Sequence, residues 1–147
     1  MYSRILVPID GSKLSDKAVR EAAQLAKLTG AALLLLHVRA VYDASISAES
    51  APLGSIGKRK IEQDVRAAGQ LVLDAAAKIA AGRGIEAKTL MVISPSPYEA
   101  IVKSAKKEKI DLIVMASHGR RGLAAVLIGS ETQKVLTHTS VPVLVVR

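Results

Sequence analysis

The sequence predicts an α/β fold, a doubly wound five-stranded parallel sheet in the order 3-2-1-4-5 with helices on both faces. First, the chain has 147 residues, 50% of them hydrophobic, and one core typically organises roughly 100–200 residues. We therefore expect residues 1–147 to form a single domain. Second, short apolar runs alternate regularly with stretches of helical periodicity. Third, several of these runs are continuously apolar, as in parallel strands that are covered on both faces.

The elements follow from these patterns in chain order. The apolar runs predict strands at residues 4–9, 33–38, 85–93, 111–116 and 141–146. The periodic stretches predict helices at residues 14–28, 58–81 and 97–109, and a last helix that starts at residue 130. Residues 39–56 are rich in Ser, Ala and Gly and predict the longest loop. Because helices separate consecutive strands, we expect right-handed crossovers and parallel strands.

The ends of the predicted helices carry residues that favour helix starts and stops. Gly30 follows the first helix and Gly82 follows the second, where a helix-ending glycine is common. Ser96 and Ser130 each stand three residues before a Glu or Gln, which is the pattern of a capping box. We therefore expect both serines to be N-caps, with Pro97 in the first helical position.

The composition excludes several classes of function. The chain has no Cys, which excludes disulfides, thiol catalysis and cysteine-bound metals. It has three Tyr and no Phe or Trp, so aromatic rings that could stack exposed bases are scarce and we expect no nucleic-acid partner. The sequence has neither a spanning apolar run nor a leader pattern, and we expect a cytoplasmic protein without a membrane partner.

The net charge of +8 is concentrated toward the C-terminal end. Residues 101–147 carry 8 Lys+Arg and 3 Asp+Glu, whereas residues 1–50 carry 6 and 5. This distribution fits either a general surface for polyanions or one phosphate site beside a solvated helix face. We favour the phosphate site, because the lysines of residues 103–109 lie on one short predicted helix, where a solvated face is the simpler interpretation.

Two segments that follow neighbouring strands are candidates for a ligand site. Residues 10–12, Asp-Gly-Ser, follow the first strand, and residues 117–129 follow the fourth. In doubly wound sheets ligands bind beyond the carboxyl ends of the strands, where the strand order reverses. In the order 3-2-1-4-5 the first and fourth strands are neighbours. The sequence therefore predicts a carboxylate that faces a loop rich in Gly and Arg.

The residue types in these segments suit a nucleotide phosphate. Gly119 and Gly129 can adopt positive φ and let backbone N–H groups approach an anion. Ser130 offers a hydroxyl at the start of a helix, whose free N–H groups attract anions. Arg120 and Arg121 can add charge-assisted hydrogen bonds, and Asp10 can accept hydrogen bonds from ribose hydroxyls. The alternative is an ordinary glycine-rich turn.

Residues 115–122, Met-Ala-Ser-His-Gly-Arg-Arg-Gly, followed by Gly-Ser at 129–130, resemble the nucleotide-binding signature of the universal stress protein family. That signature is Gly, two residues, Gly, nine residues, then Gly and Ser or Thr. Gly119 and Gly129 match its second and third glycines. Ala116 stands in the place of the first glycine, and its methyl group narrows the approach to ribose or phosphate.

The resemblance implies an ATP-binding, dimeric stress-response or signalling module with at most slow ATP hydrolysis, and we assign no catalytic residue. It implies that Asp10 accepts from the ribose and that the Val38 backbone meets the adenine. Pro8, Ile9 and Met115 would line the base pocket. The residues that the resemblance places around the phosphates are Gly119, Arg120, Gly129, Ser130, Glu131 and Thr132. An Mg or Mn ion would be held mainly by the phosphates, so we expect no protein metal ligand.

The composition and the edge position of the last predicted strand, residues 141–146, indicate a homodimer. It is apolar at every position, and in the order 3-2-1-4-5 it lies at the sheet edge, where Pro142 is tolerated. An open apolar edge favours pairing with another chain, and a two-fold partner closes it; a covering loop is the alternative.

Residues 7–12 and 141–146 also resemble the opening and closing strands of the family, so the resemblance covers the chain. The alternative function is a dimeric interaction module of the same fold that binds no nucleotide.

The sequence does not match other known functional motifs, and particular residues show why. Only the last glycine of G-x-S-x-G fits around Ser117, which argues against a serine hydrolase. A Walker loop is absent, as is GxGxxG after the first strand. The third strand ends in Val-Ile-Ser at 92–94 rather than in an aspartate, which argues against a phospho-receiver domain. His37 and His118 could lie near each other, but without Cys or a His-x3-His pair they do not indicate a metal site.

Overall fold

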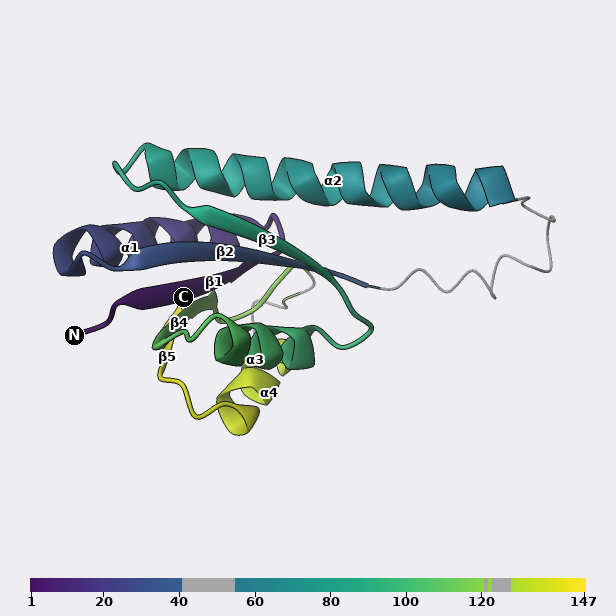
Figure 1. The fold of residues 1–147 in the computed structure, drawn as a ribbon. Helices are drawn as coiled ribbons and strands as arrows, with labels where there is room; N and C mark the ends of the chain where they lie inside the picture. Colours follow the sequence, from purple (N-terminus) through teal and green to yellow (C-terminus); the bar gives the residue numbers. More distant parts are fainter. Residues whose placement is uncertain (41–54, 121, 123–127) are drawn as a thin grey trace.

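The computed structural model (Figure 1) describes residues 1–40, 55–120, 122 and 128–147. The predicted loop at 39–56 therefore lies largely outside the described residues. The elements alternate as the sequence predicts and are, in order, β1 (Arg4–Ile9), α1 (Lys13–Thr29), β2 (Ala32–Arg39), α2 (Ser55–Ala81), β3 (Lys88–Ile93), α3 (Pro97–Lys107), β4 (Leu112–Ala116), α4 (Ser130–His138) and β5 (Val143–Val146).

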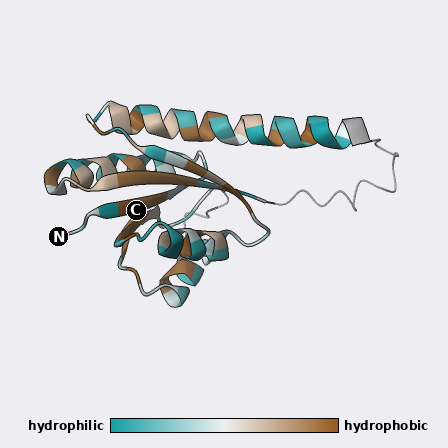
Figure 2. Ribbon diagram, in the orientation of Figure 1, coloured by the Kyte–Doolittle hydropathy of each residue, from teal (hydrophilic) through white to brown (hydrophobic). Residues whose placement is uncertain are grey.

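The strands form one five-stranded sheet in the order β3-β2-β1-β4-β5, and every neighbouring pair is parallel. The predicted fold class and strand order are confirmed. Figure 1 shows α1 and α2 on one face of the sheet and α3 and α4 on the other. Figure 2 shows that the strands between these two helix layers are predominantly hydrophobic, as parallel strands covered on both faces should be.

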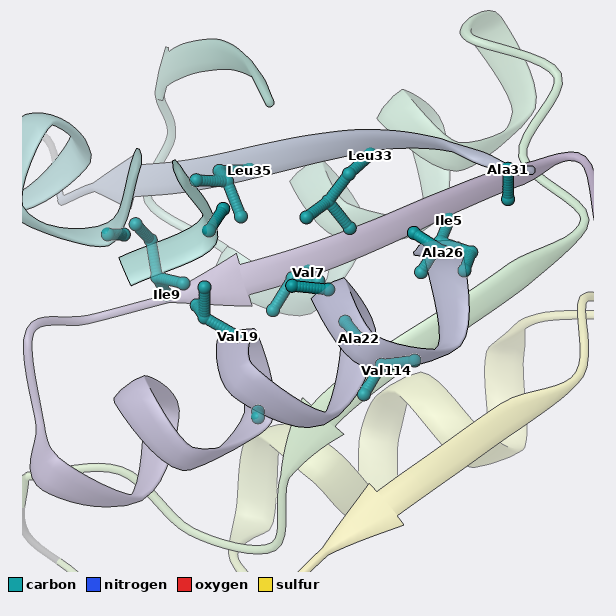
Figure 3. Close-up of a cluster of buried hydrophobic side chains, with 14 of the residues drawn as sticks. Ile5, Val7, Ile9, Val19, Ala22, Ala26, Ala31, Leu33, Leu35 and Val114 are labelled. Carbon is teal, nitrogen blue, oxygen red and sulfur yellow. The ribbon is translucent and has the colours of Figure 1, made fainter. Parts of the chain in front are cut away.

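Side chains that alternate along each strand divide the core into two clusters. From β1, Ile5, Val7 and Ile9 point toward α1 and α2, where they pack with Leu33 and Leu35 of β2 (Figure 3). Leu6 of β1 points the other way and packs with the residues that face α3 and α4, namely Leu36, Ile101, Ala105, Ile110, Ile113, Met115 and Val135. This alternation follows from the two-residue period of a strand.

Three strands begin later than the sequence predicts, β4 by one residue, at Leu112, and β3 and β5 by more. Residues 85–87 connect α2 to β3 instead of belonging to the strand, because the Ile85 N–H donates to the carbonyl of Ala80 and closes the end of the helix. Residues 141–142 precede β5. Pro142 has no N–H to give to the ladder, although its carbonyl still accepts from Ile113 N.

The helix caps differ in part from the prediction. Gly30 is the C-cap of α1 in the left-handed conformation, as expected. Ser96 is the N-cap of α3, but its side chain makes no capping hydrogen bond, so the predicted capping box does not form. Ser130 is already inside α4, whose N-cap is Gly129. The third helix ends at Lys107 rather than at residue 109.

In the described part of the chain, no helix combines the length and the apolar character that crossing a membrane would require.

Candidate functional site

A cavity of about 620 Å³ lies at the carboxyl ends of β1, β2 and β4, next to α3 and α4. Its size is within the range of small-molecule sites, roughly 300–1,000 Å³. One part of its lining, which we call the apolar wall, consists of Pro8, Leu36, Val38, Ile101 and Met115. A second part, the polar rim, consists of Asp10, His118, Gly119, Arg120, Gly122, Gly129, Ser130, Glu131 and Thr132.

The apolar wall is a continuation of the core cluster beneath α3 and α4. Leu36 and Met115 are members of that cluster, and Val38 packs against it. The strand backbone also exposes a polar group here. The carbonyl of Arg39 accepts from Ser94 N on the β3 side, so the N–H and carbonyl of the preceding residue, Val38, face β1. Because β1–β2 pairing ends at Ile9 and His37, the Val38 carbonyl lies at the edge of the cavity as an acceptor.

Asp10 is held at the end of β1 by two backbone donors. Its Oδ1 accepts from Ser12 N at 3.0 Å, and its Oδ2 accepts from Arg120 N at 3.0 Å. Burial alone would raise the pKa of Asp10. Hydrogen bonds from Ser12, Arg120 and Ser15 together lower the pKa by more than burial raises it, so the net pKa lies below the ordinary value of 3.8. The side chain is therefore an ionised acceptor near neutral pH, and it ties the turn after β1 to the loop after β4.

Gly119 and Arg120 approach the turn after β1 closely. A Cβ built on Gly119 would collide with Asp10 Oδ2. The Nη2 of Arg120 lies 2.7 Å from the place that a Cβ on Gly11 would occupy, and Gly11 has a φ of +78°. Both glycines therefore leave room for the neighbouring segment. The predicted juxtaposition of these two turns is present in the structure.

The start of α4 packs tightly on the end of β4. The Gly129 N–H donates to the carbonyl of Ser117 at 2.6 Å, and a Cβ on Gly129 would lie 3.1 Å from the Cα of His118 and 3.2 Å from that carbonyl. Gly129 has a φ of −70°, and Gly119 is not among the residues with positive φ. Neither glycine therefore uses the positive φ that glycine permits, and both positions require glycine for close contact instead.

The first turn of α4 presents donors to the cavity. The first backbone hydrogen bond of the helix runs from Gln133 N to the carbonyl of Gly129. Among the described residues, the N–H groups of Ser130, Glu131 and Thr132 have no backbone acceptor, and free N–H groups at the start of a helix favour anions. The hydroxyl of Thr132 is buried and donates to the carbonyl of Ala116 at 2.9 Å, so it fixes α4 to β4.

Glu131 has a structural contact that the sequence does not indicate. Its Oε2 accepts from Tyr98 N at 2.9 Å, and its Oε1 forms an ion pair with Lys134 at 2.9 Å. Because Ser96 does not cap α3 with its side chain, the carboxylate of Glu131 takes over that role from the neighbouring helix. Because both carboxylate oxygens make these contacts, the backbone N–H of Glu131 is the group that remains for the predicted phosphate contact.

Arg121 lies outside the described residues. The other residues that the sequence predicts for the site all line this one cavity, namely Pro8, Ile9, Asp10, Val38, Met115, Gly119, Arg120, Gly129, Ser130, Glu131 and Thr132. The structure adds Ser15, Leu36, Pro97, Ile101, Ala116, His118 and Gly122. Leu36 could have been found because it lies two residues before Val38, on the same face of the strand. Ile101 required knowledge of how α3 packs against the sheet.

The buried histidine of β2 contacts the end of β1. His37 is 5% exposed, and its Nδ1 lies 2.8 Å from the carbonyl of Ile9. Within the described ranges, no cluster of three or more His, Asp or Glu side chains could hold a metal ion. His37 instead attaches β2 to the last peptide of β1, directly before Asp10.

The family model for universal stress proteins matches residues 1–147. The chain belongs to the universal stress protein family. A curated relative, the universal stress protein YxiE of Bacillus subtilis, is 35% identical over 149 residues, which cover 100% of each chain.

Solved structures of this family have the same fold. The structure of MJ0577 from Methanocaldococcus jannaschii superimposes with a TM-score of 0.82 at 29% identity and covers 99% of this universal stress protein and 96% of that chain. Another universal stress protein, solved in complex with cAMP, has a TM-score of 0.70 at 26% identity, with 99% and 97% of the two chains covered.

Proposed function

We propose that this universal stress protein binds ATP in the cavity at the carboxyl ends of its strands and acts as a homodimeric stress-response or signalling module. The observation that carries this proposal is the pairing of an ionised Asp10 with the donor-rich start of α4 across one cavity. The related structure with cAMP supports an adenine nucleotide as the ligand. We assign no catalytic residue, and the proposal includes at most slow ATP hydrolysis.

The apolar wall suits the base. Pro8, Val38 and Met115 offer apolar surface to the flat faces of a purine. The Val38 carbonyl, which faces β1 beyond the end of the β1–β2 pairing, can accept from the exocyclic amine of adenine. Guanine carries a carbonyl at the same ring position. This carbonyl would face the Val38 carbonyl, and two hydrogen-bond acceptors would then lie against each other. We therefore propose adenine as the base, with Ile9 beside it at the end of β1.

The polar rim suits ribose and phosphates. Asp10 retains lone pairs beyond the two that accept from Ser12 and Arg120, and these can accept from the ribose hydroxyls. The phosphates would lie against the backbone N–H groups at the start of α4 and against Gly119 and Arg120. In this arrangement an Mg or Mn ion is held mainly by the phosphates, and we propose no metal ligand from the protein.

Calorimetry with ATP, with and without Mg²⁺, tests the proposal. We expect roughly micromolar affinity, about 8 kcal/mol. Gly129→Val should abolish binding, because even a single Cβ there would lie 3.1–3.2 Å from backbone atoms and the larger side chain fills the phosphate approach. Circular dichroism should verify that the variant remains folded. A wild-type chain that gives no binding heat with ATP at tens of micromolar protein would refute the proposal and would favour a module that binds no nucleotide.

That alternative has one observation in its favour. Ala116 lines the cavity in the place of the first signature glycine, so its methyl group occupies part of the approach. Replacement by glycine measures this effect. If ATP binds only to Ala116→Gly and not to the wild-type chain, the site has lost its ligand and the interaction module is the better description.

We propose that the homodimer forms through β5. This strand is the edge of the sheet, and Leu144 in its centre is 44% exposed, so a second copy can continue the sheet or cover the apolar side chains. Leu144→Glu should yield a monomer in light scattering, whereas Leu71→Glu, on α2 and 71% exposed, should remain dimeric. A Leu144→Glu chain that stays dimeric would place the interface elsewhere.

A further inference from the structure

His118 lines the polar rim, and none of the contacts proposed above uses it. Two glycines leave room for this residue, Gly122 for its ring and Gly129 for its Cα and Cβ. A Cβ on Gly122 would collide with the ring of His118, and a Cβ on Gly129 would lie 3.2 Å from the Cβ of His118. The close packing between these glycines fixes the ring beside the start of α4.

The neighbouring serine determines which ring nitrogen carries the hydrogen. Ser117 is 1% exposed, and its Oγ lies 3.1 Å from His118 Nδ1. A buried hydroxyl must donate its hydrogen to an acceptor. Among the described residues, Nδ1 is the acceptor within reach of this hydroxyl. With Nδ1 as the acceptor of this hydroxyl, a ring that carries one hydrogen carries it on Nε2.

The Nε2–H of His118 is available to a ligand. It lies on the ring edge away from Ser117, on the side of Cδ2 that faces Gly122. In the described part of the chain it has no hydrogen-bond partner, and it is not among the buried polar atoms that lack one. Because His118 lines the same cavity as the start of α4, such a donor can add to the backbone N–H groups there, which attract the same kind of group.

We propose that His118 Nε2 donates a hydrogen bond to a phosphate oxygen of the bound nucleotide, with Ser117 as the residue that positions the ring. This inference rests on the proposed ATP site and adds a side-chain donor to its backbone donors. His118 thereby contributes to the recognition of the phosphates and not of the base or the ribose.

A comparison of ATP with adenosine separates these contributions. We expect His118→Leu to weaken ATP binding by about tenfold, the effect of one hydrogen bond to a charged group, and to leave adenosine binding unchanged. His118→Gln, which retains a donor at a similar reach, should recover most of the ATP affinity. His138→Gln is the control, because His138 is exposed and lies outside the cavity lining.

The outcomes distinguish this inference from the proposed function. If the wild-type chain does not bind ATP, both fail. If it binds ATP and His118→Leu binds equally well, or if the variant loses ATP and adenosine affinity to the same extent, only the role of His118 is overturned.

A spectroscopic measurement on the wild-type chain does not depend on how the variants fold. Two-bond ¹H–¹⁵N correlations of ¹⁵N-labelled protein should show His118 with its hydrogen on Nε2, and ATP, but not adenosine, should shift this nitrogen. A ring with its hydrogen on Nδ1, or an Nε2 signal that ATP leaves in place, would overturn the assignment.

Discussion

Two aspartates at opposite ends of the sheet make nearly the same contacts. At the amino end, Asp111 accepts from Ser3 N at 2.8 Å, from Ser3 Oγ at 2.6 Å and from Arg4 N at 2.9 Å. At the carboxyl end, Asp10 accepts from the N–H groups of Ser12 and Arg120. For both side chains burial raises the pKa, and hydrogen bonds lower it to below the ordinary value of 3.8.

The surroundings of the two carboxylates differ, and the proposed binding role of Asp10 rests on that difference. Asp111 joins the starts of β1 and β4 and does not line the cavity. Asp10 joins two turns across a cavity, and Gly119 keeps the space above its Oδ2 free of a Cβ. Hydrogen bonding and a lowered pKa therefore do not identify a functional carboxylate by themselves. The open space that reaches the carboxylate is what distinguishes Asp10 from Asp111.

The largest expected difference between the two sites is in ATP affinity. Asp10→Ala should weaken ATP binding by about tenfold to a hundredfold, because acceptors for the ribose hydroxyls are lost and each such bond to a charged group is strong. Asp111→Ala should leave the affinity unchanged. Titration calorimetry on both variants measures this. Equal losses in the two variants would mean that Asp10 acts on binding only through the fold.

The next effect concerns stability, and there Asp111 should matter. Asp111→Ala removes the acceptor of three hydrogen bonds that hold the start of β1 against β4. We expect a loss of about 1 kcal/mol in the free energy of unfolding, because the site is near the surface and solvent weakens the contribution. Urea denaturation gives the value. An unchanged midpoint would show that water replaces these bonds without cost.

The fold and most of the site could be predicted from the sequence, because both follow from local patterns. The parallel sheet followed from the alternation of strands and helices, and the meeting of the two turns followed from the expected strand order, in which Asp10 and Gly119 come after adjacent strands. Contacts between elements could not be predicted this way. Capping of α3 by Glu131 depends on the distance between two helices, and the sequence indicated Ser96 instead. The reason for glycine at position 129, contact with a backbone carbonyl, also depends on packing.

A smaller effect is expected at the glycine that covers Asp10. The Cβ introduced by Gly119→Ala would collide with Asp10 Oδ2, so the carboxylate must shift and ATP affinity should fall several-fold, by less than the loss in Asp10→Ala. Gly82→Ala is the matched control, because its Cβ would make ordinary contacts at 3.5 Å. If Gly119→Ala binds ATP like the wild-type chain, the position of this carboxylate does not limit binding.

The smallest effect is the dependence of stability on pH. A carboxyl group whose pKa is lower in the folded state stabilises the fold fully above its ordinary pKa, here 3.8, and this contribution is lost as the pH falls through the lowered value. The free energy of unfolding should therefore decrease below about pH 4. Asp10→Asn and Asp111→Asn should each reduce that slope, because an amide does not titrate. Urea titrations at a series of acidic pH values measure the slopes.

ATP should steepen the slope of the wild-type chain and of Asp111→Asn, since ligand linkage adds to stability only while Asp10 is ionised. An ATP effect that does not change with pH would remove Asp10 from the ribose contact and leave the two aspartates with the same structural role.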